Sequence, residues 1–189
     1  MQREVLLTGI GGQGIQLATA LLATAAVAEG RHAMFFGSYG GMMRGGNSDT
    51  TLVLGDEPVQ SPPTVGSAWS ALVLHPAHAD AVYSRLDDDG LLVLNTSLCD
   101  PVRTPTIGRL VPIPASELAA STGNPAAVTM IALGAYAAAT AVVALESLLA
   151  AATEVLPPYR AQHAEGIRAA LRTGHAHAGP ALRAWPVLR

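Results

Sequence analysis

The feature that most constrains the fold of this chain is a glycine-rich turn between an apolar run and an alanine-rich stretch. Residues 5–7 are apolar and short enough for a buried strand, and residues 15–28 have the pattern of a helix that ends at Glu29-Gly30. Gly9, Gly11 and Gly14 lie between them with the spacing G-x-G-x-x-G. Strand, turn and helix form the first half of a βαβ unit. Such a turn lets the backbone approach a flat or anionic group, with helix N–H groups directed at it.

The sequence after this helix tests whether the turn is a dinucleotide site. Such a site has an Asp or Glu about 20 residues further on, at the end of the second strand, to hold the ribose. We predict the second strand at residues 33–36, and no carboxylate follows it before Asp49. The missing acid disfavours NAD. Two interpretations of the turn stay open, a phosphate site or close packing against the helix or a partner chain.

A second glycine-rich stretch runs from Gly37 to Asp49. Five glycines within ten residues argue against a helix or a plain strand and predict a shaped loop. Arg44 is the best single polar candidate in this loop, because backbone N–H groups and one guanidinium can together hold a phosphate or a carboxylate. An arginine that satisfies loop carbonyls or anchors an interface fits the pattern equally well.

Apolar runs alternate with helical patterns along the rest of the chain, which predicts an α/β fold. We expect a single doubly wound, mostly parallel sheet with helices on both faces. Further strands are predicted at residues 50–54, 71–74, 91–94 and 111–114. A turn is predicted at 87–90, and helices at 77–86, from 115 to Gly123-Asn124, at 125–155 and at 161–171. Residues 125–145 carry no charge, but their Ala, Thr and Gly content favours a core or interface helix over a membrane span.

The charge content narrows the classes of partner. Of the 189 residues 13% are charged, against about 25% in an average soluble domain. A surface short of charge implies that another chain covers part of it. The formal net charge is −3 and there is no basic stripe, so we expect neither nucleic acid nor a membrane as a partner. No signal peptide precedes the first strand, which favours a cytoplasmic location.

Cys99 is the single cysteine of the chain. One thiol can make no internal disulfide, and it cannot ligate an iron–sulfur cluster, which needs about four ligands. No motif surrounds Cys99, so we expect a small buried or half-buried residue. Any redox cluster associated with this protein must therefore be held by another chain.

The remaining polar groups do not form a catalytic constellation. His175 and His177 have no carboxylate or thiol near them in sequence, and a mobile tail explains them best. His75 and His78 follow a strand end, where a role in loop packing is favoured over a site. The run 87–89 is interpreted as a solvated turn before Gly90. We therefore predict no catalytic residue and no metal site in this chain.

Four motifs follow one another along the chain: Gly9-x-Gly11-Gly12-Gln13-Gly14, Tyr39-Gly40-x-x-x-Arg44-Gly45-Gly46, Gly123-Asn124 and Ala132-Leu133-Gly134. In this order they resemble the γ subunit or γ domain of the 2-oxoacid:acceptor (ferredoxin) oxidoreductases. This family includes the pyruvate, 2-oxoglutarate, 2-oxoisovalerate (branched-chain) and indolepyruvate ferredoxin oxidoreductases. The resemblance extends over residues 3–174, and the two glycine motifs are specific only in combination.

The resemblance implies a complex in which other chains carry the redox chemistry. The family oxidatively decarboxylates a 2-oxoacid with thiamine diphosphate and forms an acyl-CoA in most members. Its electrons pass through [4Fe-4S] clusters to ferredoxin. Thiamine diphosphate with Mg lies between α-type and β-type parts, while the γ part is a Rossmann-like domain that packs on them and can help enclose coenzyme A (CoA). No cofactor is expected within this chain.

The chain departs from the family pattern at several polar positions. Met42 stands where the family commonly has Glu, and Thr129 and Gly166 stand where it has Asn. An acid that the family has near the start of the strand at 71–74 is replaced around Trp69-Ser70. These changes bear on the ligand and on the branch of the family, rather than on the fold.

The sequence thus predicts a γ-type domain over residues 1–174 and a tail over 175–189, a candidate strap on a partner. The expected function is that of a non-catalytic γ subunit, inactive alone. Two alternatives stay open, a free-standing nucleotide- or CoA-binding Rossmann-like module and an assembly or structural subunit that has lost the enzyme role. The predicted cofactor-binding or interface residues are Gly9, Gly11, Gly12, Gln13, Gly14, Tyr39, Gly40, Arg44, Gly45, Gly46, Asn47 and Ser48.

Overall fold

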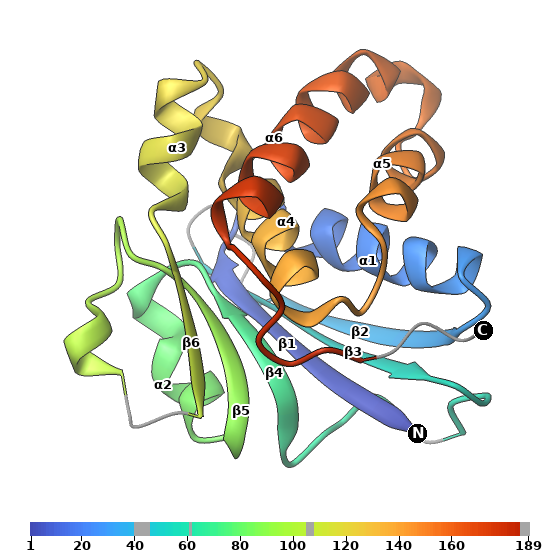
Figure 1. Ribbon diagram of the computed structural model, residues 1–189, viewed down its shortest axis with the longest axis vertical. Helices are drawn as coiled ribbons and strands as arrows, with labels where there is room; N and C mark the ends of the chain where they lie inside the picture. The colour runs from blue at the N-terminus through green and yellow to red at the C-terminus, as the bar shows by residue number, and fades with distance from the viewer. Residues whose placement is uncertain (40–45, 61, 105–107, 186–189) are drawn as a thin grey trace.

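Six strands form one sheet in the computed structural model, which describes residues 1–39, 46–60, 62–104 and 108–185 (Figure 1). Their order across the sheet is β2-β3-β1-β4-β5-β6. β1, β4, β5 and β6 are parallel neighbours, and β3 pairs antiparallel with both β1 and β2, so β3 alone runs against the rest. The mostly parallel sheet is confirmed. The strands are β1 (Gln2–Ile10), β2 (His32–Tyr39), β3 (Asn47–Gly55), β4 (Ala68–Val73), β5 (Leu86–Asn95) and β6 (Arg109–Ile113).

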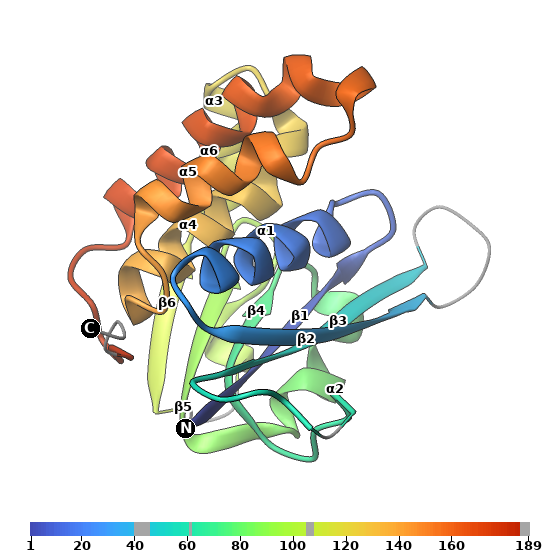
Figure 2. The same ribbon diagram turned by 90° about the vertical axis from the view of Figure 1, so that its right-hand side faces the viewer.

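Helices cover both faces of the sheet, but unequally. Figure 2 shows α2 on one face and the other helices stacked on the opposite face. The larger core lies on the side of α1 and α4, and the smaller one packs α2 against β1, β4 and β5. No helix in the described part of the chain is long and apolar enough to cross a membrane. The helices are α1 (Ile15–Ala28), α2 (Ala79–Tyr83), α3 (Ala115–Ser121), α4 (Val128–Thr140), α5 (Leu145–Glu154) and α6 (Ala164–His177).

The helices α4 and α6 cross at two glycines. A Cβ added to Gly134 would collide with the carbonyl oxygen of Leu171, and one added to Gly174 would collide with that of Ile131. Only glycine allows the two backbones to approach this closely. The Gly134 motif therefore serves helix packing, and the uncharged stretch that contains it is a buried core helix, as expected.

Three local predictions were wrong. The predicted turn at 87–90 is the irregular start of β5, where the pairing with β4 shifts between Ala68 and Ser70. The predicted helix at 77–86 is correspondingly shorter, and residue 86 already belongs to β5. The predicted single helix at 125–155 is two helices, because Ala141 adopts a left-handed conformation with φ of 48°.

The C-terminal segment packs on the chain itself. His175 and His177 belong to α6 rather than to a mobile tail, so the boundary predicted at residue 174 falls inside a helix. Residues 182–185 then cross the amino ends of the strands, with the backbone N–H of Trp185 bonded to the carbonyl of Thr140 at 2.9 Å. Trp185 is buried. A role of this segment as a strap on a partner stays a prediction.

Candidate functional site

The first glycine motif is a tight turn whose shape depends on glycine. Gly12 and Gly14 have φ of 99° and 84°, which side-chain-bearing residues rarely adopt. Gly14 is the residue before the first turn of α1. Gln13 fixes the turn, because its side-chain Oε1 accepts a hydrogen bond from the Ile10 N–H at 2.9 Å. A Cβ on Gly9 would collide with that same oxygen, so Gly9 leaves room for Gln13.

The second glycine motif joins the first at the carboxyl end of β1. The N–H of Gly11 donates to the carbonyl of Gly46 at 2.8 Å. Gly9 pairs with Ser48 and Ile10 with Asn47 in the β1–β3 ladder. Tyr39 ends β2, where its backbone pairs with Ser48. The structure therefore brings these predicted residues together at one end of the strands, where β1 and β2 end and β3 begins.

Part of the second motif lies outside the described residues. This applies to Gly40, Arg44 and Gly45, so the prediction for Arg44 stays untested. The flanks of the predicted loop are not loop at all: Gly37 belongs to β2 and Asp49 to β3. The glycine and polar residues of these flanks gave no strand pattern in the sequence, although β2 and β3 pair along the length of β2.

Asp49 is a central polar residue that the sequence did not single out. Its carboxylate accepts hydrogen bonds from Thr8 Oγ1 at 2.5 Å and from Asn47 Nδ2 at 2.6 Å. It thus ties the end of β1 to the start of β3. Because β3 lies between β1 and β2, the end of β2 is not beside the glycine turn, and no ribose-binding acid can stand there in the usual way. The register that makes Asp49 a neighbour of Thr8 is invisible in the sequence.

A cleft of about 260 Å³ opens beside the first glycine motif. The starts of α1, α4 and α6 border it. Thr129 Oγ1 donates to the carbonyl of Gln13 at 2.5 Å and fastens the turn to α4. Among the residues that the structure describes, the lining contains no Asp, Glu, Lys or Arg. It consists of Gly12, Gln13, Gly14, Leu17, Asn124, Ala126, Ala127, Met130, Gln162, His163, Gly166 and Ile167.

The cleft is lined by glycine backbone and by apolar, amide and imidazole side chains, while the Asp49 carboxylate lies outside the lining. Within the described ranges, no three His, Cys, Asp or Glu side chains come together as a metal site. Cys99 is buried, as expected, and burial raises the pKa of its thiol from 9.0 to about 11, so it is protonated at neutral pH. His75 Nδ1 accepts from the Ala77 N–H at 3.2 Å and caps a turn, which confirms its role in loop packing. The groups at this end of the sheet can bind and orient a ligand by hydrogen bonding, and the expectation that the chain has no catalytic residue stays a prediction.

Comparison with known proteins agrees with this geometry. Residues 4–176 match the family described as pyruvate ferredoxin/flavodoxin oxidoreductase. The chain belongs to this family. The pyruvate synthase subunit PorC of Methanothermobacter marburgensis is 30% identical over 82% of this chain and 86% of its own length. The 2-oxoglutarate synthase subunit KorC of Methanocaldococcus jannaschii is 28% identical, over 83% and 85%.

Solved structures agree with the fold of this oxidoreductase family. The γ subunit of a keto/oxoacid ferredoxin oxidoreductase from Geobacter sulfurreducens superposes with a TM-score of 0.79 at 26% identity, covering 94% of this chain and 97% of that one. The 2-oxoglutarate:ferredoxin oxidoreductase from Magnetococcus marinus gives 0.81 at 14% identity, over 99% of this chain but 33% of that larger chain. The predicted Rossmann-like fold is thus confirmed.

Two of the positions that the family resemblance singled out lie at or beside the cleft. Thr129 holds the glycine turn, and Gly166 lies on the wall formed by α6, where an added Cβ would be 3.5 Å from Asn124 Nδ2. Ser70 instead bonds the buried Tyr136 hydroxyl at 2.9 Å, away from the cleft lining. Met42 lies outside the described residues. Gly166 therefore lines the cleft, and Thr129 supports the turn beside it.

Proposed function

We propose that this chain is the non-catalytic γ subunit of a multi-subunit, thiamine diphosphate-dependent 2-oxoacid:ferredoxin oxidoreductase of the cytoplasm. The observation that carries the proposal is the hydrogen bond between Gly11 and Gly46, which joins the two glycine motifs at the carboxyl end of β1. Relatives of similar length are named as single subunits, which supports the same role. Thiamine diphosphate, Mg and the [4Fe-4S] clusters then belong to the α-type and β-type partners, and ferredoxin is the acceptor for the complex.

The cleft beside Gly12–Gly14 is the candidate contact with CoA. It fits part of such a ligand: N–H groups at helix starts suit a pyrophosphate, and the lining has no carboxylate to repel one. Its volume of about 260 Å³ falls below the roughly 300–1,000 Å³ of a complete small-molecule site, and we propose that a partner chain supplies further walls. When bound, CoA supplies the thiol that accepts the acyl group. The residues of this chain hold and orient the carrier.

The assembly is tested by purifying the tagged full chain from its native source. We expect α-type and β-type subunits to co-purify, and the eluate to reduce ferredoxin with a 2-oxoacid and CoA. The chain produced alone should show no turnover. Recovery of the native chain free of other subunits, or turnover by the chain alone, would refute the proposal.

The CoA contact is tested by placing charge on the cleft wall of the purified complex. Gly166→Glu should raise the KM for CoA about tenfold, and Gly166→Lys should lower it, because the two charges act oppositely on a pyrophosphate. Ala169→Glu is the matched control, since Ala169 is exposed on the same helix but does not line the cleft. If Gly166→Glu and Gly166→Lys change the KM in the same direction, or not at all, the cleft does not hold the pyrophosphate. The subunit assignment would survive that result.

A further inference from the structure

The two edges of the sheet differ in whether another strand can add to them. The edge strand β6 has five residues and contains Arg109 and the exposed Pro112, and charge, proline and short length are common ways to block edge pairing. The opposite edge strand, β2, has eight residues and pairs with β3 without a break from His32 to Tyr39. It contains no proline, Lys, Arg, Asp or Glu. Among the described residues, therefore, β6 has features that block pairing, and no strand pairs with the outer side of β2.

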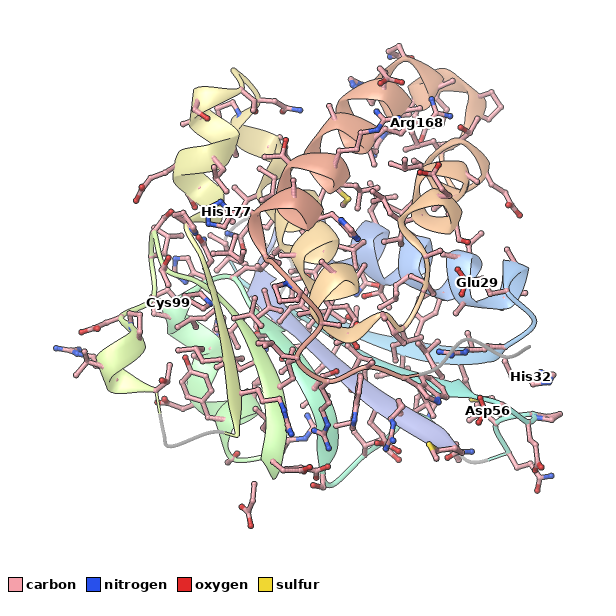
Figure 3. The ribbon with its side chains drawn as sticks, viewed as in Figure 1. Glu29, His32, Asp56, Cys99, Arg168 and His177 are labelled. Atoms are coloured by element: carbon pink, nitrogen blue, oxygen red, sulfur yellow. The ribbon has the colours of Figure 1, made fainter. Side chains whose placement is uncertain are left out.

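The β2 edge also carries exposed apolar side chains on both faces of the sheet. Phe36 is 60% exposed and Phe35 is 43% exposed, on alternate faces because they are consecutive in a strand. Met34 adds to the Phe36 face. On the Phe35 face, Val27 of α1 is 55% exposed and lines a shallow groove with Phe35. His32 projects outward at the start of the strand (Figure 3).

The exposed area decides what kind of contact this edge supports. At roughly 200 Å² for a large side chain, Val27, Met34, Phe35 and Phe36 together expose on the order of 350 Å² per chain. Two copies would bury at most about 700 Å² from these side chains, because edge pairing covers only part of each face of the sheet. The strand backbone and its polar neighbours would bring the total toward the roughly 1,200 Å² at the lower end of stable interfaces. The edge therefore fits a reversible dimer.

We propose that β2 pairs antiparallel with β2 of a second copy of this chain, joining two six-stranded sheets into one. A twofold axis perpendicular to the sheet makes such a contact self-complementary. The absence of charge along β2 favours a second copy, because the twofold axis places the central residue opposite its own counterpart and its neighbours close by, where a charge would meet a like charge. With the strand centred on the axis, Phe35 or Phe36 lies opposite the same residue of the other copy.

The first test is the mass of the full chain in solution. Light scattering after size exclusion should give a dimer at about 100 µM that dissociates on dilution, as expected for the limited area. Phe36→Lys should weaken dimerisation at least tenfold, because it places two like charges at the contact. Val102→Lys is the control, since Val102 is 90% exposed in the connection between β5 and β6. A monomeric wild type, or a dimer unaffected by Phe36→Lys, overturns the proposal.

The second test identifies the neighbour directly and does not depend on tolerance of a lysine. Phe35→Cys and Phe36→Cys are introduced one at a time, both into the chain alone and into the purified complex. The native Cys99 is 3% exposed and gives little background. One of the two variants should form a disulfide between two copies on mild oxidation, and Val102→Cys should not. Cross-linking to a different subunit, or none in either variant, overturns pairing with a second copy.

Discussion

At the amino ends of the strands, two tryptophans and three arginines alternate in a stack, whereas at the carboxyl ends glycines and neutral side chains surround a cleft. In the stack, Arg3 lies 5.1 Å from the Trp69 ring and 6.0 Å from the Trp185 ring. Arg31 lies 3.7 Å from Trp185 and Arg183 lies 5.1 Å from Trp69. These residues come from distant parts of the sequence and close that end of the molecule with side-chain packing.

The carboxyl ends are held by hydrogen bonds of the backbone and of polar side chains. Gly11 bonds Gly46, and Gln13 is fixed to Ile10 and to Thr129. The cleft lies beside this turn, at the starts of α1, α4 and α6. Burial of large aromatic groups stabilises a fold, while exposed polar backbone serves binding. The comparison therefore separates an end that maintains the fold from an end that performs the proposed function.

The largest effect should come from removing the aromatic stack. Trp185→Ala should lower the free energy of unfolding by about 3–5 kcal/mol, because a buried ring in contact with Arg31 is lost. Urea denaturation measures this change. Leu182→Ala, at a half-exposed position of the same segment, should cost less than about 1 kcal/mol. A loss below about 1 kcal/mol for Trp185→Ala would mean that the stack does not secure the amino ends.

The next effect tests the opposite end. Gly14→Ala should cost only about 1–2 kcal/mol, since the new Cβ has room, 3.9 Å from Met130 Cε, and the cost is the strain at φ of 84°. Its effect on the KM for CoA of the complex should be larger than that of Trp185→Ala. Gly14→Asn should be milder in both measurements, because Asn tolerates the left-handed conformation. Equal functional losses for Trp185→Ala and Gly14→Ala would erase the distinction between the two ends.

The carboxyl end was easier to predict from the sequence than the amino end. Residues 5–30 read correctly as strand, turn and helix, because glycine spacing and apolar pattern are local signals. The Arg3–Trp69–Trp185 contacts left no such signal, since they join residues more than sixty positions apart. The break at Ala141 was also missed, because no Gly or Pro marks it in the sequence. In the structure, distant Arg31 donates a hydrogen bond to the carbonyl of Val142, next to the break, at 2.7 Å.

The site itself was predicted only in part. Gly9, Gly11, Gly46, Asn47 and Ser48 come together as the two motifs suggested. The walls that α4 and α6 add to the cleft, including His163 and Gly166, depend on the crossing of those helices. That crossing depends on Gly134 and Gly174, and nothing in the sequence shows that these two glycines lie at the same contact. Sequence motifs identified the turn, and only tertiary packing revealed the cleft beside it.

A smaller effect concerns the thiol beyond the carboxyl end of β5. The unfolded chain loses the Cys99 proton near pH 9, whereas the folded protein keeps it until about pH 11. Between these values the folded state binds more protons, so the free energy of unfolding falls as the pH rises. Chemical denaturation between pH 8 and pH 10.5 should show this fall in the free energy of unfolding. In the Cys99→Ala variant, the fall over the same pH range should be smaller by about 1 kcal/mol. Rapid native modification by a thiol reagent at pH 7 would show instead that this end holds a reactive cysteine.

The smallest effect concerns the charges at the rim of the amino-end stack. Asp89 accepts two hydrogen bonds from Arg183 Nη2, at 2.9 and 3.0 Å, but its side chain is 70% exposed. Exposed ion pairs contribute at most about 1 kcal/mol, so Asp89→Asn should change the free energy of unfolding by less than that. The difference from wild type should shrink further at about 0.5 M salt, where screening is strong. If Asp89→Asn instead cost as much as Trp185→Ala, charge rather than aromatic burial would hold the amino ends together, and both ends of the sheet would depend on polar contacts.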